Sequence, residues 1–179
     1  MLAQPMKALL LLHTEPAFDA ADPAAAAAAL RQSGLVVALT AFNDALVEHA
    51  DVMLPIAPFT ETAGTFVNAE GRVQGFHAAV KPLGEARPAW KVLRVLGTML
   101  ELPGFGFETA EEVRAQALGD LDALAQRLNN GVELSPAVLS GGAGLERIAD
   151  VPIYGADVLV RRAPALQQTG DARAPEVSV

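Results

Sequence analysis

Residues 35–55, LVVALTAFNDALVEHADVMLP, decide the fold of this chain. Residues 35–39 are a short, unbroken apolar run, and residues 51–54 are an aspartate followed by three apolar residues. Such runs are typical of strands buried in a parallel sheet. Between the two runs, Asn43 is placed to cap a brief helix over residues 44–50, and Pro55 stops the second strand. The stretch therefore predicts a strand, a crossover helix and a parallel strand.

The residues that precede this stretch extend the same pattern. Residues 6–12, MKALLLL, read as a first buried strand. Asp22 followed by Pro23 predicts the start of an alanine-rich helix, which Gly34 ends. The order strand, helix, strand, helix, strand predicts an α/β fold with a Rossmann-like parallel sheet (βαβαβ) whose two faces are both covered.

Two further segments follow the predicted sheet. Residues 59–76, FTETAGTFVNAEGRVQGF, predict a β-excursion, and Pro88 begins a helical segment. Thr109 and Glu112 form the pattern of a capping box for one helix that runs to residue 128. We divide the chain into a Rossmann-like α/β part, a helical segment, a docking segment and a flexible tail, which are residues 1–87, 88–130, 131–166 and 167–179.

The composition excludes several classes of protein. The chain has 179 residues, a formal net charge of −8 and no cysteine. It therefore forms no disulfide, binds no zinc through thiolates and carries no iron–sulfur cluster of its own. The acidic charge argues against nucleic acid as a partner. No apolar run approaches the ~20 residues that direct membrane insertion requires.

Patterns for catalysis and metal binding are not found in the sequence. The turn after the first strand, HTEPAFDAADP, lacks the glycines that let a backbone approach a pyrophosphate. Glu61 and Glu70 have the chemistry of an acid–base pair, but two carboxylates in one loop more often serve turns and caps. We predict no catalytic residue and no metal site, because the histidines lack ligand-like spacing and the serines lack a nucleophile elbow. These residues are His13, His49 and His77, and Ser33, Ser135 and Ser140.

Parallel sheets bind ligands at the carboxyl ends of their strands. Here those ends are residues 13–15, 40–43 and 55–61. The β-excursion leaves the third end, so Glu61 and Asn68 are either ligand contacts or acceptors for the backbone N–H groups of a tight, buried excursion. In the second case Gly64 and Gly71 take turn conformations. We favour this structural interpretation.

Three stretches also carry a family resemblance. Residues 49–76, HADVMLPIAPFTETAGTFVNAEGRVQGF, and residues 80–97, VKPLGEARPAWKVLRVLG, resemble the G subunit of bacterial NADH-quinone oxidoreductase, respiratory complex I. Residues 145–167, LERIADVPIYGADVLVRRAPALQ, are similar to the same protein, and PLGEARPAW at 82–90 is the most specific mark. A broader pattern resembles the molybdopterin oxidoreductase superfamily. Its elements are Ala50, Asp51, Leu54, Pro55, Glu61, Gly64, Thr65, Asn68, Gly71, Arg72 and Gln74.

The resemblance implies a loop on the cofactor side of the fold. In molybdenum enzymes of the superfamily this loop lies toward the pterin, which makes Glu61, Thr65 and Asn68 the candidate cofactor-binding residues. In the complex I branch the pterin is generally absent and the fold is kept as a scaffold, so we expect no cofactor in this chain. The iron–sulfur clusters of the family lie on a cysteine-rich N-terminal region that this sequence does not match. We therefore expect the sequence to be a piece of a longer subunit.

The function that the resemblance implies is that of a non-catalytic scaffold segment of the G subunit, which takes part in electron transfer from NADH to quinone. The alternatives are a part of a molybdopterin-dependent oxidoreductase similar to formate dehydrogenase, and an independent α/β binding module. The expected partners are other domains of the same protein and other peripheral-arm subunits, and apolar surfaces would let the chain self-associate. The implied location is cytoplasmic, peripheral to the bacterial inner membrane through complex I.

Overall fold

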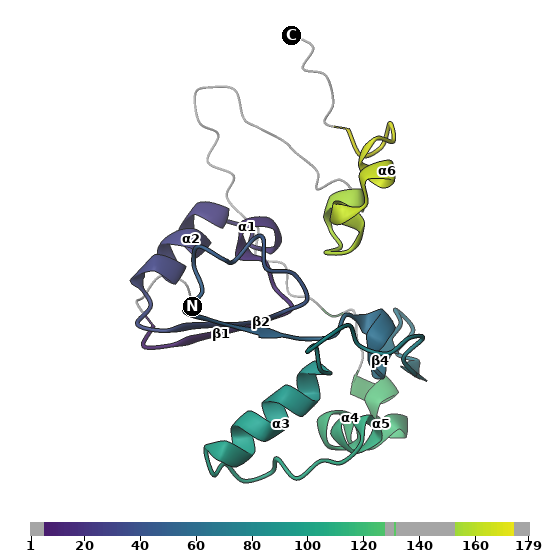
Figure 1. The fold of residues 1–179 in the computed structure, drawn as a ribbon. Coiled ribbons are helices and arrows are strands. Elements are labelled where there is room, and N and C mark those ends of the chain that lie inside the picture. The colour runs from purple at the N-terminus through teal and green to yellow at the C-terminus, as the bar shows by residue number, and fades with distance from the viewer. Residues whose placement is uncertain (1–5, 128–130, 132–152, 174–179) are drawn as a thin grey trace.

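A parallel sheet of three strands forms the centre of the protein. The computed structural model describes residues 6–127, 131 and 153–173. The strands are β1 (Leu9–Leu12), β2 (Val36–Thr40) and β3 (Val52–Pro55), and they lie in the order β1-β2-β3 (Figure 1). All neighbouring strands are parallel, with Leu9 opposite Val36 and Val37 opposite Val52. The predicted α/β fold with a parallel sheet is confirmed.

The alanine-rich helix forms as its sequence predicts. Helix α2 (Pro23–Gln32) begins where Asp22 Oδ1 accepts a hydrogen bond from Ala25 N at 2.9 Å. This bond satisfies one of the free N–H groups of the first turn. A short helix that the sequence did not predict, α1 (Pro16–Asp19), precedes it. The core between α2 and the sheet consists of Leu30, Val36, Ala38 and Leu46, with Leu9, Leu11, Ala50 and Met53 packed around them.

Only one face of the sheet is covered by α1 and α2 (Figure 1). Leu9 and Leu11 pack into the core, whereas Leu10 and Leu12, which alternate with them, are 50% and 40% exposed. The second face is therefore covered only in part in the described residues: Leu39 on this face is 0% exposed, but the prediction of full cover is wrong at Leu10 and Leu12. The strand order explains the difference, because right-handed crossovers between consecutive neighbouring strands place both connections on the same face.

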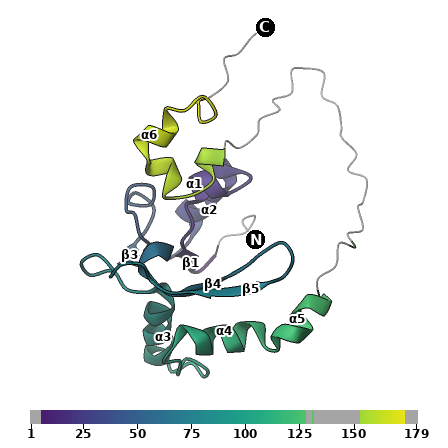
Figure 2. The ribbon, with the colours of Figure 1, turned by 90° about the vertical axis from the view of Figure 1, so that its right-hand side faces the viewer.

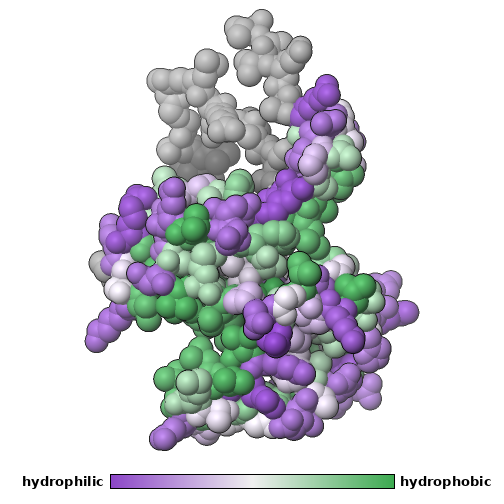
Figure 3. Space-filling model, in the orientation of Figure 1, coloured by the Kyte–Doolittle hydropathy of each residue, from purple (hydrophilic) through white to green (hydrophobic). Residues whose placement is uncertain are grey.

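The second face, which we call the open face, carries the strand residues that alternate with those in the core. These residues are Leu10, Leu12, Val37, Leu39, Val52 and Leu54. Helix α3 (Ala89–Met99) lies on this side of the sheet. A hollow of 480 Å³ separates Leu54 from the helix residues Val92, Val95 and Met99. Figure 3 shows apolar surface on both sides of this hollow.

Residues 44–50 form turns and not the predicted helix. His49 N and Ala50 N both donate to Leu46 O, which closes a single turn. So short a segment does not repay the cost of helix nucleation. Leu46, which is 2% exposed, anchors the turn in the core instead.

The β-excursion is an antiparallel hairpin of β4 (Gly64–Val67) and β5 (Val73–Phe76), preceded by the 3₁₀ turn η1 (Phe59–Glu61). Gly71 has the predicted turn conformation, with φ of 79°. Gly64 does not, because it lies inside β4, where an added Cβ would approach the Phe76 ring to 2.5 Å. The excursion is also not buried as predicted, since Phe59 at its start is 48% exposed. Phe66 is 59% exposed and stacks on Phe76 with centroids 4.9 Å apart.

The helical segment contains α3, α4 (Ala110–Leu118) and α5 (Leu121–Arg127). Thr109 Oγ1 accepts from Glu112 N at 3.1 Å, so the predicted cap of α4 is confirmed. The single helix predicted over this region is wrong, because Gly119 adopts φ of 65° and separates α4 from α5.

Residues 153–173 form a separate small segment that returns to the α/β part beside α1 (Figure 2). It contains η2 (Ile153–Gly155), η3 (Val160–Arg162) and α6 (Pro164–Gln167). Most of the predicted docking segment, residues 132–152, lies outside the described residues. Ser135 and Ser140 belong to this part. Residues 174–179, at the end of the predicted tail, also lie outside the described residues. None of the helices within the described ranges is long and apolar enough to cross a membrane.

Candidate functional site

A cavity lies where the sequence predicts one, at the carboxyl ends of β2 and β3. Its volume is 330 Å³, and it is lined by Thr40, Ala41, Phe42, Asn43, Met53, Leu54 and Pro55. The Thr40 hydroxyl is already used within the loop, since it donates to Phe42 O at 2.8 Å and accepts from Phe42 N. The cavity therefore offers apolar walls and few free polar groups.

The neighbouring part of the same edge, at the ends of β1 and β2, is occupied by the chain itself. Arg161 and Arg162 reach it from the C-terminal segment and form ion pairs with Glu15, Asp19 and Asp44. Glu15 is 2% exposed although it carries a charge. The pairing with arginine compensates its burial.

His13 also lies at this edge, directly after β1. Its backbone adopts φ of 51°, which is uncommon for a residue other than glycine. The residue is exposed, but partial desolvation of its imidazole lowers the pKa, because desolvation disfavours the charged form. The neutral form of His13 is thus favoured over a wider pH range than in a fully solvated histidine.

Glu61 and Asn68 accept hydrogen bonds from the backbone, as the structural interpretation predicts. Glu61 Oε2 accepts from Leu83 N at 3.0 Å and ties the hairpin to the chain that leads into α3. Asn68 Oδ1 accepts from Glu70 N at 3.0 Å and from Arg72 N at 2.8 Å, which closes the hairpin turn. Contact of either residue with a cofactor stays a prediction.

Asn68→Ala is expected to lower the free energy of unfolding by about 1 kcal/mol, because two backbone donors of the turn lose their acceptor. Both donors are near solvent, so water replaces part of the loss. Urea denaturation measures the change, and Asn68→Asp, which keeps the oxygen, is the matched control. Equal stability of Asn68→Ala and the unsubstituted protein would contradict the role of this side chain.

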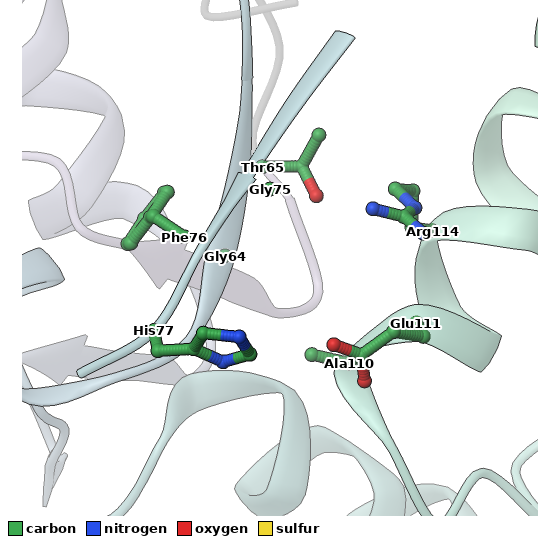
Figure 4. A pocket seen from close by; sticks show the side chains of 8 residues that line it. All are labelled: Gly64, Thr65, Gly75, Phe76, His77, Ala110, Glu111 and Arg114. Carbon is green, nitrogen blue, oxygen red and sulfur yellow. The ribbon is translucent and has the colours of Figure 1, made fainter.

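Thr65 lines a pocket of 270 Å³ between the hairpin and α4 (Figure 4). The side chains of His77, Glu111 and Arg114 border the same space, whereas Phe76 points to the other side of the hairpin. The pocket thus combines a hydroxyl, an imidazole and charges of both signs. Its volume is below the ~300 Å³ at which ligand pockets usually begin.

The other sequence candidates do not form a catalytic group in the described residues. Glu61 binds the Leu83 backbone, while Glu70 is exposed in the hairpin turn. Ser33 donates to Ala29 O within α2. In the part of the chain that the structure describes, no group of three or more His, Asp or Glu side chains is placed so that it could hold a metal ion.

Comparison with known proteins identifies the family. The family model for molybdopterin oxidoreductases matches residues 1–99, which include the sheet, the hairpin and α3. The chain belongs to the molybdopterin oxidoreductase family. Within this family, it is 49% identical over 76 residues to the G subunit of NADH-quinone oxidoreductase from Mycobacterium bovis, a match that covers 42% of this chain.

Two further proteins are similar to parts of this chain. The 78 kDa subunit of mitochondrial NADH-ubiquinone oxidoreductase from Candida albicans is 53% identical over 58 residues, 32% of this chain and 8% of that protein. A putative formate dehydrogenase of Staphylococcus aureus is 37% identical over 73 residues, 41% of this chain and 7% of that protein. The match to the M. bovis protein covers 9% of its length, so the chain corresponds to a small part of these relatives.

The family name implies a molybdopterin, which carries a phosphate, and neither the cavity at β2 and β3 nor the Thr65 pocket fits it. The cavity at β2 and β3 is lined by no lysine, arginine or histidine, and the adjoining edge holds the carboxylates of Glu15, Asp19 and Asp44. Phosphate sites need cations or free backbone N–H groups. The Thr65 pocket has a cation but is too small to enclose a pterin. Contact of Thr65 with a cofactor stays a prediction.

The sequence predicted the ligand-binding edge of the sheet, but it did not predict that Arg161 and Arg162 occupy part of this edge. It named residues 13–15 and 40–43 as strand ends, and it quoted the arginine pair at 161–162 without a role. The sequence carried no usable signal for this contact, because the burial of Glu15 is visible only in the structure. Once the burial is known, the glutamate requires a cationic partner, which comes from elsewhere in the chain.

Proposed function

We propose that this chain is a non-catalytic scaffold segment of the G subunit of an NADH-quinone oxidoreductase, which takes part in electron transfer from NADH to quinone. The observation that carries the proposal is the 49% identity to the M. bovis protein over 76 residues. The described residues offer a sheet, a hairpin and helices, and the two pockets at the predicted ligand positions do not fit the cofactor that the family name implies. This supports a structural role within such a protein.

The open face of the sheet supports a scaffold role. Leu10, Leu12 and Val52 are 40–50% exposed there, and Val95 and Met99 of α3 are 50% and 77% exposed beside them. Contiguous apolar surface of this kind marks a contact with other protein. We propose that other parts of the same protein, and peripheral-arm subunits around it, cover this face. When they are absent, the same surface favours self-association.

The test is isolation of the tagged protein from its native cells in mild detergent. NADH–quinone reductase activity is expected in the same fraction. Leu10→Glu with Leu12→Glu is expected to remove that activity from the tagged fraction. The two carboxylates would lie on the open face, where the partner proteins are proposed to bind. Arg31→Glu, on the exposed side of α2, changes the net charge equally and is expected to leave the activity in place. Recovery of the tagged protein alone would contradict the proposal.

The relatedness to a putative formate dehydrogenase supports a second candidate, a part of a molybdenum oxidoreductase. Elemental analysis of the same fraction separates the two. A scaffold in complex I predicts iron without stoichiometric molybdenum, with the iron–sulfur clusters on other parts of the assembly, whereas the alternative predicts molybdenum. The proposed location is the cytoplasmic side of the membrane, and protease protection of the tagged fraction in membrane vesicles of known orientation tests it.

A further inference from the structure

Three carboxylates and two aromatic rings gather at the ends of β1 and β2. They are Glu15, Phe18 and Asp19 from the turn and helix after β1, and Phe42 and Asp44 from the turn after β2. We call this group the acidic cradle. It forms because the carboxyl ends of neighbouring parallel strands lie at one edge of the sheet. Within the cradle, Asp19 Oδ2 also accepts from Glu15 N, which fixes the turn around Glu15.

Arg162 fits the cradle with both edges of its guanidinium. Nη1 and Nη2 donate to the two oxygens of Glu15 at 3.2 and 2.5 Å, and Nε and Nη2 donate to the two oxygens of Asp44 at 3.1 and 2.5 Å. Its Cζ lies over the Phe42 ring, 4.2 Å from the centroid. Two forked pairs need a planar group with several donors, which arginine has and lysine lacks.

Arg161 completes the contact less fully. Its Nη2 donates to Asp19 Oδ1 at 2.8 Å, Nε lies 3.5 Å from Glu15 Oε2, and the guanidinium lies 4.9 Å from the Phe18 ring centroid. The side chain is only 9% exposed, yet Nε and Nη1 find no hydrogen-bond acceptor among the described residues. A buried donor without an acceptor weakens a contact, so Arg162 contributes more than Arg161.

The C-terminal segment that carries the two arginines is held together by hydrogen bonds within the segment. Asp157 Oδ1 accepts from Leu159 N and Val160 N, and Gln167 Nε2 donates to Tyr154 O and Val160 O. These bonds lie inside residues 153–173 and do not depend on the sheet. The segment is therefore organised to carry an arginine pair to a surface.

We propose that the acidic cradle is a recognition site for an arginine-pair peptide, which residues 153–173 fill in the same chain. The site reads the guanidinium fork and not only positive charge. Hydrogen bonding to Arg162 holds the pKa of the Asp44 carboxyl below its usual range, as expected of a carboxylate kept charged for this contact. The proposal concerns the chain alone and does not depend on membership of complex I.

The test uses the full chain with Arg161→Gln and Arg162→Gln, which empties the cradle, and a fluorescent peptide of residues 153–173. Anisotropy is expected to show the peptide binding the opened chain at least ~10-fold more tightly than the unsubstituted chain, in which the attached segment competes. Adding Asp44→Asn to the opened chain is expected to weaken binding at least ~10-fold. No binding to the opened chain, or equal binding to both chains, would overturn the proposal.

Variants of the peptide separate recognition of the fork from attraction of charge. Arg162→Lys in the peptide is expected to weaken binding at least ~10-fold, whereas Arg161→Lys is expected to weaken it ~3-fold or less, because Arg162 makes both forked pairs. Lysine peptides that bind as well as the arginine peptide would show electrostatic attraction only, and the recognition site would be disproved.

A second measurement holds even if the opened chain folds poorly. In the otherwise unsubstituted chain, Asp44→Asn is expected to speed amide hydrogen exchange at residues 161–163 by at least ~10-fold, since docking of the segment is weakened. Glu48→Gln removes an exposed carboxylate of the same turn and is expected to change nothing there. Unchanged exchange in Asp44→Asn would count against the cradle as the holder of the segment.

Discussion

Leu39→Ala is expected to lower the free energy of unfolding by about 3 kcal/mol, the usual cost of truncating a fully buried leucine. Leu39 is 0% exposed in the central strand, between Leu12 of β1 and Leu54 of β3. The loss combines transfer of the side chain to water with the cavity that remains. Urea denaturation measures it, and the expected fall in Tm is about 6–12 °C.

The matched control is Leu10→Ala, on the same face of the neighbouring strand. Leu10 is 50% exposed, so its truncation in the isolated chain is expected to cost less than about 1 kcal/mol. Equal losses for the two variants would contradict the described burial. A large loss for Leu10→Ala alone would show that self-association covers the open face, and a concentration series would reveal it.

Gly97→Ala is expected to destabilise the protein by about 2 kcal/mol, although alanine normally stabilises a helix by about 1 kcal/mol relative to glycine. Gly97 is buried in α3, and an added Cβ would lie 2.3 Å from Cγ and Cδ1 of Phe105. The ring must move to make room, and its packing against the helix is lost. Thermal and urea unfolding measure the net effect.

Two further variants isolate the cause of that effect. With Phe105→Ala in the background, Gly97→Ala is expected to stabilise the protein, because the ring is gone and only the helix preference remains. Gly106→Ala, where an added Cβ meets nothing within 4 Å, is expected to be neutral or mildly stabilising. A destabilising Gly97→Ala in the absence of the ring would refute the steric explanation.

The sequence predicted the helix caps, one turn and the parallel sheet, because each depends on residues that are near one another in the chain. The caps at Asp22 and Thr109 appear as hydrogen bonds to the third residue after each, and the glycine at 71 has the positive φ of a turn. The parallel sheet follows from apolar runs at crossover spacing. Glycine serves both turns with positive φ and places of close approach, and the sequence does not show which applies. Gly64 was assigned to a turn, but the structure requires it because the Phe76 ring lies close to it.

Properties that depend on distant parts of the chain were not predictable in this way. Four consecutive leucines in β1 indicate burial on both faces, but the strand order leaves Leu10 and Leu12 exposed in the described residues. The contact of Arg162 with Glu15 joins residues 147 positions apart, and periodicity carries no information about such pairs. Residues 44–50 have a helical composition, but they form a turn whose own residue Leu46 is buried in the core.

The same separation of 147 residues sets an order of events during protein synthesis. Ribosomes add about 5–20 residues each second, so Glu15 leaves the ribosome about 7–30 s before Arg162. During that interval the nascent sheet carries an uncompensated carboxylate at its ligand edge, and arginines of other molecules have first access to it. Docking of the chain's own arginines therefore follows the synthesis of the sheet and cannot assist its first formation.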